Sequence, residues 1–266
     1  LTSFDSDGFT LGSSATDNQT SGSMVSWNWK GGGTAVSNGD GDITSSVSAN
    51  TTAGFSVVSY AGSGNAGDTV GHGLSQTPDL IIIKNRSAIT NWVVNSPLID
   101  STFVKWAMKL DLAEAISADT TIWDSTAPGA SVFTLGTAGE SNRNNPDNYM
   151  AYCFHSVEDY SKVGTYTGNS NADGAFVYTG FSPAFLMIKG DYATLNWNMF
   201  DNRRPNQLDA DPGLVANLTS ITTYPGAIDL LSNGFKIRTA GGQINHTTEF
   251  LYLAFAETPF KTANAR

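Results

Sequence analysis

The chain has 266 residues and a net charge of −10, from 14 Lys and Arg against 24 Asp and Glu, and only 14% of its residues are charged. This acidic balance excludes a protein that binds the nucleic-acid backbone through a basic surface. Ser, Thr, Asn and Gly make up 40% of the chain and hydrophobic residues a further 40%, which predicts a folded protein with a polar but weakly charged surface.

Three further features limit the class of protein. No run of residues approaches the roughly 18 apolar residues of a membrane-spanning helix, so we expect no membrane span. The single cysteine, Cys153, excludes an internal disulfide framework. His72, His155 and His246 are too far apart in sequence for a short zinc-ligand motif. We therefore expect no metal site of this kind and no bound cofactor.

From the N-terminus onward, polar and apolar residues alternate and Gly, Asn and Pro separate the segments, which predicts short β-strands. Asp7-Gly8 predicts a turn, and residues 24–29 predict a strand rich in aromatic residues. Residues 30–53 begin with three glycines and predict a flexible linker. An edge strand is expected within this linker, over 42–47.

The middle of the chain predicts a hairpin followed by an ambiguous segment. The apolar run 80–83 is typical of a strand covered on both faces, and 91–94 is its expected partner. Residues 102–116 contain good helix formers, yet their apolar residues alternate. We predict a strand to about Leu110 and a short helical turn over 112–116.

The second half of the chain repeats the first. Residues separated by about 105 positions match in the same order along the two halves. The matching pairs are Tyr60 and Tyr166, Pro78 and Pro183, Lys84 and Lys189, Trp92 and Trp197. A shorter element recurs three times and aligns Phe9 with Phe133 and Phe235, and Trp29 with Phe154 and Phe255. Such self-similarity indicates repeated structural units.

These elements predict an all-β protein of tandem antiparallel β-sandwich, jelly-roll-like repeat units, preceded by an orphan half unit. The expected boundaries are 1–29 for the back half of an incomplete unit, 30–53 for the linker, 54–160 for the first unit and 161–266 for the second. We expect the chain to be the C-terminal portion of a longer repeat protein. The alternative is an N-terminal hairpin that completes a neighbouring domain.

Several sequence blocks, spread over nearly the whole chain, carry a resemblance to a known family. They are SDGFTLG at Ser6, WNWKGGGT at Trp27, TVGHGLSQTPDLIIIKNRS at Thr69, DGAFVYTGFSPAFLMIK at Asp173 and FAETPFKTANAR at Phe255. With these blocks the chain resembles a repeat domain of tail-fibre-like structural proteins of tailed bacteriophages, marine ones in particular. The resemblance implies a non-enzymatic virion component, part of a tail fibre or another host-facing appendage.

The same resemblance sets the expected partners. They are other virion proteins and copies of the same chain, assembled as a trimer by analogy with other fibres. Bacterial surface glycans or proteins are the expected targets, bound through many weak contacts. Three alternatives stay open: a lectin-like carbohydrate-binding module, a capsid-decorating or purely architectural fibre, and a polysaccharide depolymerase. The sequence assigns no ligand-binding residue.

A depolymerase would need two carboxyl groups flanking a glycosidic bond. The candidate pairs are Asp5/Asp7, Glu158/Asp159 and Asp209/Asp211. All three lie in turn-like segments, which favours solvated side chains and a chain without catalytic residues.

Asn38, Asp40 and Asp42 have the alternate spacing that opens a calcium-binding loop. The position where such a loop needs a glutamate is occupied by Ala49. An acidic linker is the favoured interpretation, and weak calcium binding stays open.

The remaining candidates are a cysteine and the aromatic residues. Cys153 lies two residues before His155, a spacing that would suit a nucleophile and its base, but the alternating pattern favours a buried structural thiol. Exposed aromatic rings can stack on sugars. Recurrence at matching repeat positions instead favours a shared core, and it applies to Trp27, Trp92, Tyr152, Trp197 and Tyr252.

Overall fold

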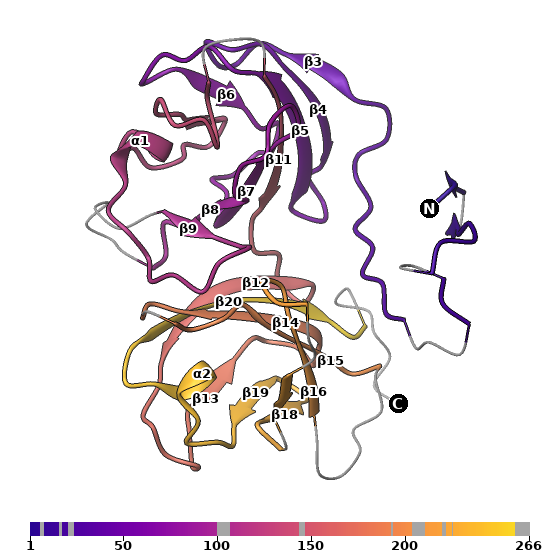
Figure 1. Cartoon of the computed structure of the whole chain (residues 1–266), viewed down its shortest axis with the longest axis vertical. Helices are drawn as coiled ribbons and strands as arrows, with labels where there is room; N and C mark the ends of the chain where they lie inside the picture. Colours follow the sequence, from indigo (N-terminus) through magenta and orange to yellow (C-terminus); the bar gives the residue numbers. More distant parts are fainter. Residues whose placement is uncertain are drawn as a thin grey trace.

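The computed structural model describes residues 1–5, 8–15, 18–20, 24–99, 107–143, 147–192, 194–203, 211–219, 222–224 and 226–258, of which 211, 212 and 222–224 are described for the backbone alone. Within these residues the chain is nearly all antiparallel β-structure, in two sandwich-like units that lie one above the other (Figure 1). The all-β, sandwich-like class predicted from the sequence is confirmed.

The first unit is built on a seven-stranded sheet with the strand order β3, β4, β5, β11, β7, β8, β9. These strands span Val36–Asn38, Ser45–Asn50, Phe55–Ala61, Asn148–Phe154, Leu80–Asn85, Val93–Asn95 and Met108–Lys109. A ribbon of β6 (Thr69–Gly71) and β10 (Val132–Thr134) packs on one face of the sheet together with the short helix α1 (Thr120–Trp123). The predicted hairpin is confirmed, because β7 pairs with β8.

The second unit repeats this plan with a six-stranded sheet in the order β12, β20, β14, β15, β16, β17. These strands span Ser161–Thr167, Glu249–Ala256, Pro183–Gly190, Asn198–Asp201, Asp211–Val215 and Thr222–Tyr224. A three-stranded sheet covers its inner face with α2 (Gly242–Asn245), and its strands β13, β19 and β18 span Phe176–Tyr178, Gly234–Ile237 and Ile228–Leu231. No helix in the described part of the chain is long and apolar enough to cross a membrane.

Residues that match in the sequence repeat occupy matching places in the two large sheets. β11 lies between β5 and β7, as β20 lies between β12 and β14. Tyr60 stacks on Tyr149 with ring centroids 5.2 Å apart, and Tyr166 stacks on Phe250 at 5.0 Å. The repeat in the sequence therefore corresponds to a repeat of strand order and of core packing.

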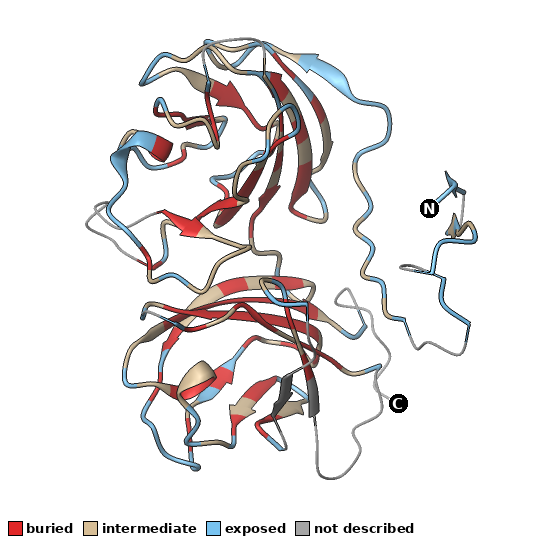
Figure 2. Cartoon of the chain, viewed as in Figure 1, coloured by how far each residue is buried: buried red, intermediate tan, exposed pale blue. Residues whose placement is uncertain are grey.

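Each large sheet is covered on both faces. On β11, Ala151 and Cys153 face the core of the first unit, whereas Tyr152 and Phe154 face the second unit. β20 alternates in the same way between the core of the second unit and the space between the units. Buried residues accordingly follow the central strands of both large sheets, whereas the edge strand β3 is largely exposed (Figure 2). The continuous apolar runs in β7 and β14 follow from this double coverage.

The segment predicted as a flexible linker, residues 30–53, instead belongs to the first unit. It contains β3, which forms the edge of the first sheet, and β4, which pairs with both β3 and β5. The edge strand expected over 42–47 is therefore displaced: the strand begins at Ser45 and lies one position inside the edge. The three glycines at the start of the segment suggested a flexible backbone, and the linker was predicted on that ground.

Those glycines allow close packing against β4. The Ser48 hydroxyl donates to the Gly33 carbonyl at 2.7 Å, and the Asn50 amide donates to the Lys30 carbonyl at 3.1 Å. A Cβ on Gly32 would lie 1.9 Å from the Ala49 carbonyl oxygen. Only glycine permits this approach of two backbones.

Replacing Gly32 with alanine is expected to destabilise the protein by about 1–3 kcal/mol, because the new methyl group overlaps the backbone of β4. Urea unfolding followed by tryptophan fluorescence measures the change. Gly39→Ala is the matched control, since a Cβ there meets no atom within 4 Å. Equal stabilities of the two variants would contradict the packing argument.

Two other predicted elements differ from the structure. Residues 24–29 belong to no sheet of the described residues, because their indoles pack between the units in place of strand pairing. Residues 112–116 are not helical: after β9 the chain turns at 110–112 and continues to the second unit, where the Ala113 carbonyl accepts from the Thr194 N–H at 2.8 Å. These tertiary contacts replace helical hydrogen bonds. Residues 102–106 lie outside the described residues.

The N-terminal hairpin stands to one side of both units (Figure 1). β1 (Ser3–Phe4) pairs with β2 (Phe9–Thr10), and the Asp5 N–H donates to the Gly8 carbonyl at 2.9 Å. The predicted turn lies in this region, although Asp7 itself is outside the described residues.

Candidate functional site

The joint between the two units is an apolar layer formed by the facing sides of the large sheets. We call it the middle layer. Its buried residues come from both units and include Phe55, Leu80, Ile82, Val94, Met108 and Phe154 of the first, with Phe185, Met187, Trp197, Leu251, Leu253 and Phe255 of the second. Burial of this many large apolar side chains is the main force that holds the units together.

The N-terminal segment contributes two tryptophans to the middle layer. We call residues 24–34 the strap. Trp27 packs edge-on against Phe185 with ring centroids 5.0 Å apart. Trp29 lies 6.2 Å from Phe154 and 5.5 Å from Phe255. Trp29, Phe154 and Phe255 are the three residues that correspond in the sequence repeat, and the fold brings them together in one aromatic cluster.

Polar bonds cross the joint at one end. The Nζ of Lys189, a fully buried residue on β14, donates to the Glu114 carbonyl of the first unit at 2.7 Å and to the Leu195 carbonyl at 2.6 Å. The indole N–H of Trp197 donates to the Lys109 carbonyl of the first unit at 2.8 Å. These bonds satisfy buried donors, so they fix the register in which the units meet.

The chain passes between the units through a short link that is also tied down. The Asp79 carboxylate accepts hydrogen bonds from the N–H and the hydroxyl of Ser156, both at 2.7 Å. The Ser156 hydroxyl in turn accepts from the Val163 N–H at 3.0 Å. The link therefore connects the start of β7 with β12, and it resists rotation of one unit against the other.

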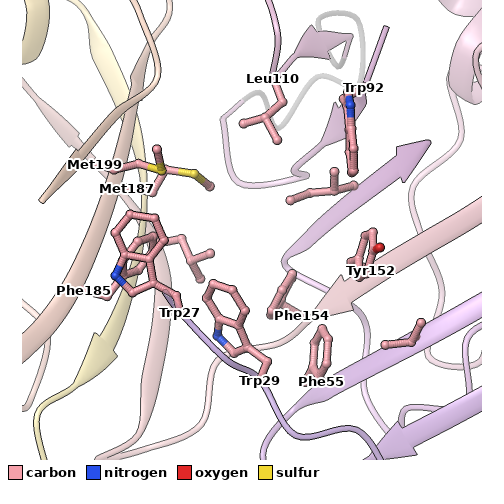
Figure 3. Close-up of a pocket in the computed structure, with 13 residues that line it drawn as sticks. Trp27, Trp29, Phe55, Trp92, Leu110, Tyr152, Phe154, Phe185, Met187 and Met199 are labelled. Atoms are coloured by element: carbon pink, nitrogen blue, oxygen red, sulfur yellow. The ribbon is translucent and has the colours of Figure 1, made fainter. Parts of the chain in front are cut away.

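The middle layer leaves a cavity of about 360 Å³ between the two sheets. Its walls are apolar and aromatic side chains from both sheets and from the strap (Figure 3). The strap and the second unit supply Trp27, Trp29, Phe185, Met187, Met199 and Leu253, and the first unit supplies the other side, including Trp92 and Tyr152. The volume falls in the lower part of the range for small-molecule pockets.

Lys189 is a buried ionisable group at the joint. Burial lowers the pKa of Lys189 to about 8, although the nearby carboxylates of Asp191 and Glu114 act in the opposite direction. A lysine whose pKa is lowered on folding releases its proton more readily in the folded state than in the unfolded one.

The pH dependence of stability follows from this shift. Between about pH 8 and pH 10 the unfolded chain keeps a proton on Lys189 that the folded chain loses, so this residue makes the free energy of unfolding rise with pH. Its contribution is unfavourable below about pH 8. Urea unfolding at several pH values is expected to show a smaller rise in Lys189→Met than in the unchanged chain. Identical slopes would contradict the shift.

The predicted carboxylate pairs do not line the cavity where they are described. Asp5 accepts from the Ser3 and Thr10 hydroxyls at 3.0 and 2.7 Å in the N-terminal hairpin. Glu158 and Asp159 lie in the turn between β11 and β12, where Asp159 has a φ of 61°. Asp7 and Asp209 lie outside the described residues, and Asp211 is described for its backbone alone.

The residues considered for calcium form hydrogen bonds with one another and with Thr69. The Asn38 amide donates to the Asp40 carboxylate at 2.9 Å. The Asp42 carboxylate accepts from the N–H and the hydroxyl of Thr69 at 3.1 and 2.7 Å, and these bonds lower the pKa of Asp42. They join the segment after β3 to β6. Across the described residues, no group of three or more His, Cys, Asp or Glu side chains is placed to hold a metal ion.

Cys153 is fully buried in the first core, as the alternating pattern predicted. Burial raises the pKa of the Cys153 thiol to about 12, so the reactive thiolate is scarce near neutral pH. His155 is buried as well, and its Nδ1 lies 3.0 Å from the Ser156 carbonyl oxygen.

The repeated aromatic residues divide into two groups. Trp197 is 1% exposed and Tyr252 is buried, so the core prediction is confirmed for both. Trp27, Trp92 and Tyr152 are only half-buried and line the cavity, which the sequence did not predict. The alignment of Lys84 with Lys189 could have indicated partly or fully buried lysines, because in both repeats a lysine follows directly on an apolar run.

The chain belongs to a family defined by a domain of unknown function, DUF7483, which matches residues 1–259. Comparison with curated proteins and with solved structures finds no match.

Proposed function

We propose that the chain is a rigid, non-enzymatic structural module of a tailed-bacteriophage particle, a segment of a tail fibre or another host-facing appendage. In this role its task is display: stacked sandwiches hold their loops at fixed positions toward a bacterial surface. Other virion proteins and further copies of the chain, as a trimer, would supply the neighbours. Attachment to surface glycans or proteins would then gain strength from many weak contacts.

The observation that supports this role best is the middle layer. Linked domains usually move relative to each other unless their interface is large and hydrophobic. Here the facing sheets, the strap and the buried Lys189 and Trp197 bonds join the units. A module that keeps its loops in a fixed orientation along an appendage needs such a rigid interface. The resemblance of several sequence blocks to tail-fibre-like proteins is what suggests the setting of a phage appendage.

The test is the place of the chain in a particle. Antibodies raised against the purified chain should label tail appendages of intact particles in immunogold electron microscopy, and the chain should appear in the proteome of purified virions. Labelling over the head would favour capsid decoration and contradict a host-facing role. Particles without the chain would overturn the proposal.

A lectin-like role is the second candidate, and it is favoured by an exposed aromatic pair on β13. Phe176 is 47% exposed and Tyr178 is 59% exposed, and the Lys162 ammonium lies 5.6 Å from the Tyr178 ring centroid. Aromatic faces beside a polar group suit sugar rings. Binding of bacterial polysaccharide should fall in Tyr178→Ala and persist in Ile89→Ala, a change at an exposed apolar residue of the other unit. Equal binding by the two variants would remove this candidate.

A further inference from the structure

Two lysine–tryptophan pairs occupy matching positions in the repeat, and the fold treats them differently. Lys189 and Trp197 of the second unit are covered by the end of β9 and by the segment that follows it. Trp197 donates to the Lys109 carbonyl at the end of β9, and Lys189 donates to the Glu114 carbonyl of the following segment. The same segment places Leu110 and Ile116 in or against the middle layer. The second unit therefore shows what this site accepts: hydrocarbon against the sheet and oxygen acceptors at the lysine.

The matching pair in the first unit has no such cover from the described chain. Lys84 is half-buried and donates to the Thr90 carbonyl of its own hairpin. Its ammonium lies 5.9 Å from the Trp92 ring centroid. Trp92 is half-buried and forms part of the cavity wall. The cavity thus lies beside the pair that lacks a covering segment.

The cavity is suited to hydrocarbon. All of its lining residues are apolar or aromatic, so water inside would find few hydrogen-bond partners. Met187 and Met199 face it from the second unit, and methionine side chains adapt their shape to different apolar groups. A volume of about 360 Å³ is too small for a folded domain and suits a single hydrocarbon chain.

We propose that this cavity binds the hydrocarbon chain of a single-chain amphiphile with an anionic oxygen head group, such as a fatty-acid carboxylate. The hydrocarbon chain of the ligand lies between Trp27, Trp92 and Met187. The head group lies at the rim near Lys84, where it takes the place that the Glu114 carbonyl holds at Lys189. The site is independent of where the protein stands in a particle, so its failure would leave the proposed structural role unchanged.

Bromine-labelled dodecanoate is the probe, because bromine quenches the fluorescence of a tryptophan that it touches, and Trp27, Trp29 and Trp92 line the cavity. We expect saturable quenching with one ligand per chain, reversed by unlabelled dodecanoate. Absence of saturable quenching below the concentration at which the fatty acid aggregates would overturn the proposal.

Two kinds of variant locate the ligand. Val57→Phe, on β5, and Leu110→Phe, in the turn after β9, fill the cavity from the first unit and should weaken binding at least about tenfold. Val36→Phe is the matched control, since Val36 is 65% exposed on the edge strand. Near-ultraviolet circular dichroism selects the cavity variant that keeps the fold. Quenching as strong in that variant as in Val36→Phe would place the ligand elsewhere and contradict the site.

Lys84→Met tests the head group. The variant should bind bromine-labelled dodecanoate about tenfold more weakly, because it lacks a charge-assisted hydrogen bond. It should bind the corresponding neutral alcohol with unchanged affinity. Equal affinity of Lys84→Met and the unchanged chain for the carboxylate would refute the role of Lys84 in the proposal.

Discussion

Replacing Trp197 with alanine is expected to lower the free energy of unfolding by about 3–5 kcal/mol. The side chain is 1% exposed, so its removal leaves a large cavity in the middle layer. The change also deprives the Lys109 carbonyl of a donor 2.8 Å away. Because these contacts join the two units, the variant should lose the coupling between them as well as stability.

Trp92→Ala is the matched control, since it removes the same side chain from the corresponding position of the other unit. Trp92 is half-buried and faces the cavity, so we expect a loss of at most about 2 kcal/mol. Urea unfolding followed by far-ultraviolet circular dichroism measures both changes. Equal losses would show that the joint does not depend on the Trp197 contacts.

Replacing Asn142 with alanine is the second large effect, with an expected loss of at least about 3 kcal/mol. Asn142 is fully buried. Its side-chain oxygen accepts from the N–H groups of Ser63 and Gly64 at 2.7 and 3.0 Å. Its side-chain nitrogen donates to the Asn65 and Gly136 carbonyls at 2.9 and 2.8 Å. Alanine would leave several buried polar groups without partners.

The second unit offers an internal replicate of this test. Asn245 is also fully buried. Its side-chain oxygen accepts from the Asn169 N–H at 2.9 Å, and its side-chain nitrogen donates to the Thr239 carbonyl at 2.6 Å. Asn245→Ala should therefore destabilise to a similar degree. Asn65→Ala is the control, because that side chain is exposed, and the change should cost less than about 0.5 kcal/mol. A small effect in Asn142→Ala would contradict the view that these amides organise the loops.

The sequence predicted the strands and hairpins because their signals are local. Alternation and the apolar runs identified β7 and β14 as strands covered on both faces, and the 105-residue offset identified the repeated plan. The prediction of a flexible linker from residue 30 onward was wrong for a physical reason. Three glycines suggest freedom of the backbone, but the contact that makes Gly32 necessary comes from the Ala49 carbonyl of another segment.

The candidate site was harder to predict because it forms between units. Periodicity shows that a strand has two apolar faces, but it does not show what covers each face. Trp29, Phe154 and Phe255 correspond in the repeat, yet only the fold brings them into contact. The difference between Lys84 and Lys189 depends on the path of the chain after β9, where the sequence predicted a helical turn.

The rigidity of the joint can be measured directly with two spin labels, one on each unit. Labels at Ser46→Cys on β4 and Thr167→Cys on β12 would occupy exposed positions, and the buried Cys153 would not compete for the reagent. Pulsed electron paramagnetic resonance measures the distance between the two labels. It should give one narrow distance distribution for the otherwise unchanged chain and a broader one when Trp197→Ala is added. A broad distribution in the otherwise unchanged chain would show that the units move freely, and it would contradict a rigid module.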